Sequence, residues 1–174
     1  MKLFFISTVT AYDLHEVTQG YWGSWKGVKL CPAHQAICGV NAKISESKGL
    51  KDDTGNNALK FKCCSLDAWG ANQGEFEANQ NKRGEYDMFF TMCDFGTFVT
   101  GMDALLQGKQ GKDDDTAMGG VKIICDSYKQ GETKLNTHRI VTRWGSWVKQ
   151  DRDDLETVQK KTLFCGASVR VEED

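Results

Sequence analysis

The chain has 174 residues, including 18 Gly, one Pro, nine Phe and five Trp, and its formal net charge at pH 7 is −2. A nucleic-acid-binding protein would carry a basic stripe, so this balance argues against a nucleic-acid partner, and no apolar run is long enough to span a membrane. The length fits one domain, residues 1–174. Glycine combined with aromatic and β-branched residues indicates short strands joined by tight turns.

The first element that we expect is a strand over residues 2–7 (Lys-Leu-Phe-Phe-Ile-Ser). This segment begins like a signal peptide, but its apolar run is shorter than the roughly 7–15 residues that such a peptide needs. The alternative is an initiator methionine placed on a mature chain, and we favour the strand.

A block of sequence occurs twice at an offset of 62 residues. In each copy a Gly-x-x-Asp-Asp-Thr turn leads into an apolar strand that ends in cysteine, at residues 49–54 with 59–63 and at residues 111–116 with 121–125. Coinciding offsets of this kind indicate an internal repeat, which we divide into units of residues 1–58, 59–120 and 121–174.

A second signature frames this block. Trp-Gly-Ser-Trp at residues 22–25 returns at residues 144–147, about two periods later, and residues 84–87 (Gly-Glu-Tyr-Asp) are a degenerate counterpart in the second unit.

Each unit also contains a strand led by glycine, at residues 39–44, 101–106 and 166–171. The first, third and fifth residues after each glycine are apolar, which is the period of a strand with one buried face. The third unit reaches Asp174 without its own Asp-Asp-Thr turn and following strand. We therefore expect residues 2–7 to supply that strand beside residues 166–171, with Phe4 or Phe5 pointing into the core. An incomplete repeat is the alternative.

The register of this closing strand is predicted from lysines that lead the apolar strands. Lys2 takes the place of Lys60 and Lys122 when the three units are superimposed.

The spacing of four of the seven cysteines follows the repeat. Cys31 and Cys63 are 32 residues apart, and so are Cys93 and Cys125, as a disulfide within each repeat would require. Zinc ligation is the alternative, but there is no C-x-x-C pair and the three histidines lack the spacing of a zinc site. The spacing thus predicts disulfides, no metal and a secreted, extracellular protein.

These motifs resemble the family of the vitelline membrane outer layer protein 1. Its members carry three copies of a Gly-x-Trp-Gly-x-Trp segment, a cysteine, a Gly-led strand, a Gly-x-x-Asp-Asp-Thr-Ala turn and an apolar strand ending in cysteine. The resemblance covers nearly the whole chain, through residues 21–25, 31, 38–39, 49–54 and 59–64 in one copy, 93, 101, 111–117 and 121–125 in the next, and 143–147 and 165–166 in the third.

The resemblance implies an all-β fold, a β-prism of three Greek-key sheets around an apolar core with a pseudo-three-fold repeat. It also implies a secreted component of egg coats or of other extracellular fluids and layers, and a carbohydrate-related transfer activity has been attributed to the family. The chain departs from the pattern because its second unit lacks the Trp pair, its third lacks the turn and final cysteine, and it starts at a permuted point.

Three cysteines remain to be placed. We expect Cys31 and Cys38 to pair with Cys63 and Cys64, and we favour Cys31 with Cys63 and Cys38 with Cys64 over the exchanged pairing. Cys165 aligns with Cys38 through the glycine that follows each of them. We predict a buried thiol for Cys165, and an intermolecular disulfide is the alternative.

Two groups of residues are candidates for carbohydrate binding. Paired carboxylates suit sugar chemistry, but Asp and Thr side chains also fix turns by bonding backbone amides, and repetition in the same frame favours that structural role. The tryptophans have two interpretations as well, packing at the core or rim, which we favour, and stacking on sugar rings. The candidates are Trp22, Trp25, Trp144, Trp147, Asp52, Asp53, Asp114 and Asp115.

We interpret the chain as a non-enzymatic, structural or carbohydrate-binding component of an extracellular coat or fluid, with no cofactor and no catalytic residue assigned. Its expected partners are glycans or extracellular matrix proteins, with no nucleic acid and no membrane. The alternative is a glycan-processing enzyme that uses paired carboxylates for glycosyl transfer or hydrolysis.

Overall fold

The structure is a computed structural model that describes residues 3–7, 13–16, 24–45, 56–71, 73–79, 84–106, 118–127, 137–140 and 163–171. Every regular element in these ranges is a β-strand, which confirms the all-β class. Within the same ranges, no helix is long and apolar enough to cross a membrane.

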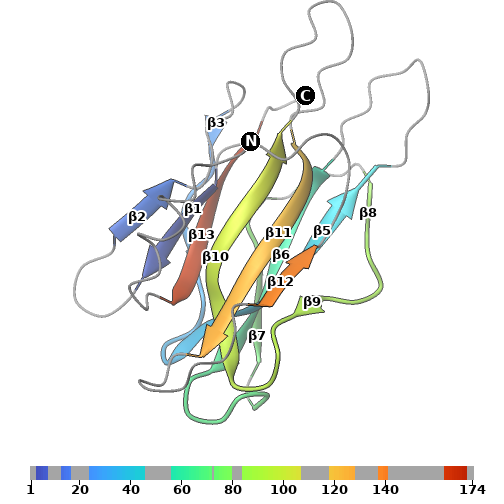
Figure 1. The fold of residues 1–174 in the computed structure, drawn as a ribbon. Coiled ribbons are helices and arrows are strands. Elements are labelled where there is room, and N and C mark those ends of the chain that lie inside the picture. The colour runs from blue at the N-terminus through green and yellow to red at the C-terminus, as the bar shows by residue number, and fades with distance from the viewer. Residues whose placement is uncertain are drawn as a thin grey trace, which may run out of the picture.

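The described strands form three sheets, each named here after its Gly-led strand (Figure 1). The β5 sheet has the order β7-β6-β5-β8, with β9 also pairing β5, and consists of Gln35–Ile44 (β5), Asn56–Ser65 (β6), Gly74–Glu77 (β7), Glu85–Tyr86 (β8) and Thr91–Met92 (β9). The β10 sheet has the order β10-β11-β12 and consists of Thr97–Leu106 (β10), Met118–Ser127 (β11) and Thr137–Ile140 (β12). The β13 sheet has the order β2-β1-β13-β3, with β4 also pairing β13, and consists of Leu3–Ser7 (β1), Asp13–Glu16 (β2), Ser24–Trp25 (β3), Lys29–Leu30 (β4) and Phe164–Val171 (β13).

Strand pairing in the β5 sheet recurs in the β10 sheet. Asn41 lies opposite Lys60 in the first, and Asp103 lies opposite Lys122 in the second, so both partners are shifted by 62 residues. A β-bulge falls immediately before the leading glycine in both pairs. The repeated sequence block therefore folds into the same local pairing each time it occurs.

The N-terminal segment closes the β13 sheet as predicted. β1 lies between β2 and β13, and its pairing with β13 is antiparallel. The predicted register was wrong by two residues, because Phe4 rather than Lys2 lies opposite Ser168, which stands two residues after its leading glycine as Asn41 does. Strand side chains alternate with period two, so a shift of two keeps every residue on its face and the pattern alone cannot detect it.

The core lies between the three sheets. The first and third residues after each leading glycine lie in this core, as predicted: Val40, Ala42, Met102, Ala104, Ala167 and Val169. The polar residues between them, Asn41, Asp103 and Ser168, are buried as well, so the prediction of a single buried face was wrong at these positions, and the fifth residue Ile44 is only partly buried. The main cluster includes Val40 and Phe61 of the β5 sheet, Met102 and Ile123 of the β10 sheet, and Phe164 and Val169 of the β13 sheet. Side chains of β1 lie outside the described set, so the inward direction of Phe4 or Phe5 stays a prediction.

The short strands β4 and β9 pair antiparallel with Gly-led strands at the leading glycines. β4 pairs with β13 at Gly166, and a Cβ placed on that glycine would lie 2.6 Å from the backbone oxygen of Lys29. β9 pairs with β5 at Gly39, where the close neighbour is the flexible side chain of Met92. Glycine is required at Gly166, because the backbone of the neighbouring segment occupies the space of its side chain.

Deletion of residues 1–7 tests the closure of the β13 sheet. We expect insoluble protein, or protein without a cooperative thermal transition, because β13 would lose its central partner and leave a row of backbone groups unpaired. Thermal unfolding and the soluble fraction are the measurements. A control that lacks only residues 1–2 keeps β1 and should melt within about 2 °C of the full chain. A deletion variant with unchanged stability would contradict the closure.

Candidate functional site

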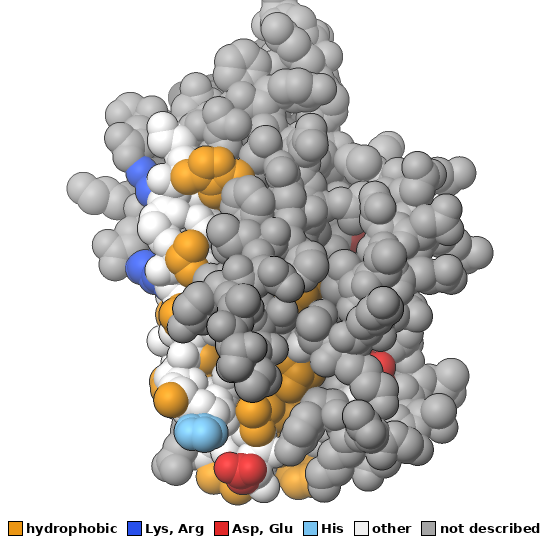
Figure 2. Space-filling model, turned by 90° about the vertical axis from the view of Figure 1, so that its left-hand side faces the viewer, with side chains coloured by type: hydrophobic (Ala, Val, Ile, Leu, Met, Phe, Trp, Pro, Cys, Tyr) orange, Lys and Arg blue, Asp and Glu red, His pale blue; other side chains and the backbone are white. Residues whose placement is uncertain are grey.

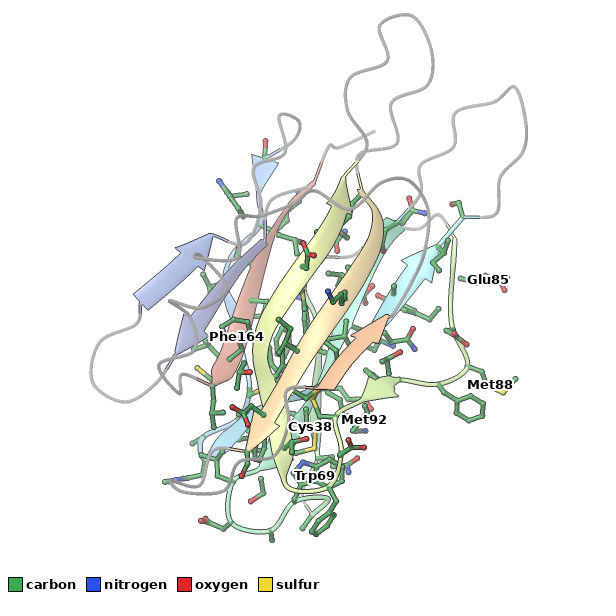
Figure 3. All side chains as sticks on the ribbon, viewed as in Figure 1. Cys38, Trp69, Glu85, Met88, Met92 and Phe164 are labelled. Carbon is green, nitrogen blue, oxygen red and sulfur yellow. A yellow bond between two sulfur atoms is a disulfide. The ribbon has the colours of Figure 1, made fainter. Side chains whose placement is uncertain are left out.

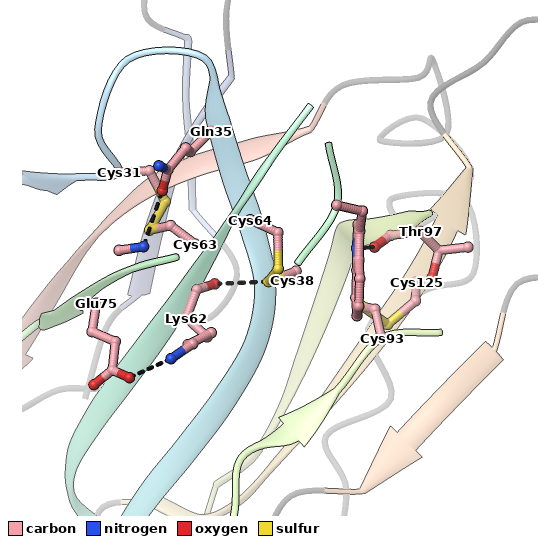
Figure 4. Close-up of a disulfide and its surroundings, with 12 residues drawn as sticks. Cys31, Gln35, Cys38, Lys62, Cys63, Cys64, Glu75, Cys93, Thr97 and Cys125 are labelled. Carbon is pink, nitrogen blue, oxygen red and sulfur yellow. Dashed lines mark hydrogen bonds and ion pairs between the residues drawn. A yellow bond between two sulfur atoms is a disulfide. The ribbon is translucent and has the colours of Figure 1, made fainter. Parts of the chain in front are cut away.

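All three expected disulfides are present, between Cys31 and Cys63, Cys38 and Cys64, and Cys93 and Cys125 (Figure 4). Two of them join neighbouring sheets. Cys31 follows β4 of the β13 sheet and bonds to β6 of the β5 sheet, while Cys93 follows β9 of the β5 sheet and bonds to β11 of the β10 sheet. The Cys38 bridge instead joins β5 to β6 within one sheet. Two corners of the fold are thus held covalently.

The third corner differs. Ser7 lies opposite Phe164 after the bulge, in the place that Cys63 and Cys125 hold opposite Ile37 and Val99 in the other sheets. The chain therefore carries a hydroxyl where the other two units carry the inter-sheet cysteine.

Cys165 occupies the bulge position of Cys38. Its thiol is buried and takes part in none of the three disulfides, which confirms the predicted buried thiol. Burial raises the pKa of the Cys165 thiol above its ordinary value, since the buried thiolate would lose its hydration. The group is therefore held in its protonated, weakly reactive form.

Of the predicted carbohydrate-binding residues, Trp25 lies within the described part of the chain. It is on β3, opposite Arg170 of β13, and 39% of its surface is exposed. The remaining candidates lie outside the described residues: Trp22, Trp144, Trp147, Asp52, Asp53, Asp114 and Asp115. Their assignment to turns, core packing or ligand contact stays a prediction.

Tyr86 is the counterpart of Trp25 in the β5 sheet. It lies opposite Lys43, four residues after the leading glycine Gly39, as Trp25 lies opposite Arg170, four residues after Gly166. The degenerate segment at residues 84–87 therefore takes the place of the Trp-Gly-Ser-Trp segment and presents a phenol instead of an indole.

The Tyr86 side chain extends across the outer face of the β5 sheet. Its hydroxyl donates to a carboxylate oxygen of Glu77, although β8 and β7 are separated in the sheet by both β5 and β6. The Nζ of Lys60 lies 4.4 Å from the centre of the ring, and the Nζ of Lys43 lies 5.5 Å from it. The ring is thus fixed at its far end and flanked by two ammonium groups.

Burial and the hydrogen bond to Glu77 raise the pKa of the Tyr86 hydroxyl above its ordinary value, burial being the larger cause. Ionisation would remove the donated proton and place a second negative charge beside the Glu77 carboxylate.

The same face continues toward β7 and β9. Lys62 forms an ion pair with Glu75, with Nζ and Oε1 2.5 Å apart, and its Nζ lies 5.5 Å from the centre of the Phe90 ring (Figure 4). The buried Asn41 amide donates to the backbone oxygen of Asp87 at 2.8 Å, which anchors the β8–β9 connection to the sheet. The result is a surface of rings, ammonium groups and carboxylates, which can offer stacking and hydrogen bonds to a sugar.

Sequence reasoning missed this face. A signal was present, since lysines and glutamates each recur at spacing two, and Lys60 and Lys62 lie opposite Glu77 and Glu75. The four-residue strand β7 has no repeated marker that would have placed it beside β6. Metal binding has no support within the described ranges, where no group of His, Cys, Asp and Glu side chains is arranged to hold an ion.

Comparison with known proteins places this geometry in context. A family model described as Vitelline membrane outer layer protein I matches residues 9–66 and 75–174. A mouse (Mus musculus) protein named vitelline membrane outer layer protein 1 homolog is 27% identical over 110 residues, and the human (Homo sapiens) protein of the same name is 23% identical over 110 residues. Each match covers 63% of this chain and 50% of the relative, so the chain spans about half the length of these curated relatives.

Alkaline titration tests the Tyr86 hydrogen bond. The pKa of the Tyr86 hydroxyl is raised in the folded state, so the native state holds this proton more tightly than the unfolded state. The hydrogen bond therefore contributes its full stability below pH about 10, where unfolded tyrosine titrates. As pH rises above about 10, stability is lost. Ultraviolet titration should show one tyrosine ionising after the others, and Tyr86→Phe should remove that late step. If all four tyrosines titrate together in the wild-type protein, the bond is not maintained in solution.

Replacement of the Cys93–Cys125 bridge by two serines tests the covalent corner. The bridge closes a span of 32 residues, so we expect a loss of about 3–4 kcal/mol on the chain-entropy model, measured by urea unfolding. Cys165→Ala is the matched control, because it removes a buried cysteine but no bridge and should cost less. An unchanged urea midpoint in the double variant would show that the corner does not depend on the bridge.

Proposed function

The chain belongs to the vitelline membrane outer layer protein I family, and from this membership we propose that it is a secreted, carbohydrate-binding structural component of an extracellular coat or fluid. The names of the mouse and human relatives refer to an outer layer of the vitelline membrane. An extracellular layer is accordingly the setting that we propose for this chain.

The disulfides support an extracellular setting. Disulfides persist in oxidising compartments and are rare where thiols are kept reduced, and here two of the three hold separate sheets together. A reducing environment would remove the covalent links at both corners.

The Tyr86 constellation is the observation that carries the carbohydrate-binding half of the proposal. Glu77 holds the phenol in place, and Lys60 and Lys43 flank its ring. Sugars present both apolar ring faces and hydroxyls, so a positioned aromatic ring beside donors and acceptors matches their chemistry. Trp25 provides the same element on the β13 sheet.

The alternative, glycan processing, requires an acid and a base or nucleophile on opposite sides of the scissile bond. Glu75 and Glu77 lie on one face of β7, where Glu75 pairs with Lys62 and Glu77 accepts from Tyr86. Carboxylates engaged in this way favour positioning of a ligand over its turnover.

A glycan array probed with the disulfide-intact protein tests the proposal. Tyr86→Ala should weaken binding by about three- to tenfold, the value of one lost aromatic contact, while Phe95→Ala removes an exposed ring elsewhere and should leave binding unchanged. Mass spectrometry of the recovered glycans distinguishes the alternative, since shortened or extended products would establish an enzyme. Absence of binding across the array would contradict the carbohydrate-binding half.

A further inference from the structure

Exposed hydrophobic side chains are confined to two short stretches of the described chain. The large hydrophobic residues exposed there are Trp25, Val28, Leu30, Met88, Phe89 and Phe95. The first three lie in residues 24–34 and the other three in residues 85–96. Such residues mark interaction surfaces when they gather rather than scatter.

The two stretches are structural equivalents. Cys31 N donates to the Cys165 oxygen and Cys93 N donates to the Cys38 oxygen, each at 2.7 Å. Each stretch then makes a turn in which backbone φ is positive, at His34 (60°) and at Gly96 (77°), again 62 residues apart. Both contain a short strand that pairs antiparallel with a Gly-led strand.

Their charges are opposite. Residues 24–34 contain Lys26 and Lys29 and no acidic residue, so we name this stretch the basic edge. Residues 85–96 contain Glu85, Asp87 and Asp94 and no Lys or Arg, so we name it the acidic edge. Three lysines of the β5 sheet lie beside the acidic edge. Lys43 and Lys60 contact the Tyr86 ring, and Lys62 contacts Phe90 and Glu75.

Both edges lie at the surface, at different corners of the fold. Figure 2 views the side of the β13 sheet, to which the basic edge belongs, and shows hydrophobic side chains reaching the surface there. Figure 3 shows Met88 of the acidic edge projecting away from the sheets, and Met88 and Phe89 are 83% and 74% exposed. The disulfide of Cys31 anchors one edge at the corner of the β13 and β5 sheets, and that of Cys93 anchors the other at the corner of the β5 and β10 sheets.

From these observations we propose that the basic edge of one copy of this chain docks against the acidic edge of a second copy. Apolar side chains supply the contact and the opposite charges select the partner edge, because like edges repel. An interface between two different surfaces of one protein is heterologous, so a docked pair retains one open basic edge and one open acidic edge, and association continues into chains or rings. The inference deepens the structural role proposed above. The acidic edge includes Tyr86, so docking and the proposed glycan binding share part of one surface, and docking is tested without glycan.

Charge exchange between the edges tests the docking with the full, disulfide-intact protein and no glycan. One variant, Lys26→Glu/Lys29→Glu, makes both edges acidic; the other, Asp87→Lys/Asp94→Lys, makes both basic. Sedimentation velocity from about 1 µM to 1 mM should show species larger than a dimer for the wild type, and an apparent Kd weaker by about tenfold or more for either variant alone. Mixing the two variants at equal concentration should restore association. A folding defect in either variant cannot produce that rescue.

Two further variants separate apolar contact from charge. Met88→Ser/Phe89→Ser leaves the charges intact and should weaken association, whereas Gln73→Lys adds a charge at an exposed position outside both edges and should not. The inference is overturned if the wild type stays monomeric up to about 1 mM, if the mixed variants fail to associate, or if a different coat protein is required before any assembly forms. Self-association without binding on the glycan array would keep the docking and reject only the carbohydrate-binding half.

Discussion

The close pairing of each crossing segment with a glycine-led strand is the contact on which the rest of the structure depends. β4 pairs with β13 at Gly166, and β9 pairs with β5 at Gly39. Each crossing segment belongs to the stretch of chain that precedes the next Gly-led strand, so these hydrogen bonds connect one unit of the sequence to another. Because Gly166 has no side chain, the backbone of β4 pairs closely with β13, and the cysteines that follow β4 and β9 bond to the neighbouring sheet.

Much of this could be predicted from the sequence where information was local or repeated. The alternation after each leading glycine placed Val40, Met102 and Val169 in the core, and the doubled spacing placed the disulfide cysteines. The register of β1 could not be fixed, because a shift of two residues preserves the face of every side chain. Phe4 and Lys60 occupy the same place in their sheets although one is apolar and the other charged.

The site was harder to predict than the fold because its parts come from strands that are distant in sequence. Tyr86, Lys60 and Glu77 meet only after β8, β5, β6 and β7 have paired in that order. Equivalent backbone positions can also carry different chemistry, since Tyr86 and Trp25 hold the same position in their sheets and one side chain is a phenol and the other an indole. The repeat conserves the backbone and leaves each unit able to present a different surface.

Because Ser7 stands where the other two units have a bridging cysteine, the third corner of the fold should open more easily than the two disulfide-linked corners. The β5 sheet is tied covalently to both neighbours, whereas the unit containing β1 has a hydroxyl where the others have a bridging sulfur. Separation along this third corner breaks hydrogen bonds and apolar contacts but no covalent bond at that position, so it is the seam along which partial opening costs least.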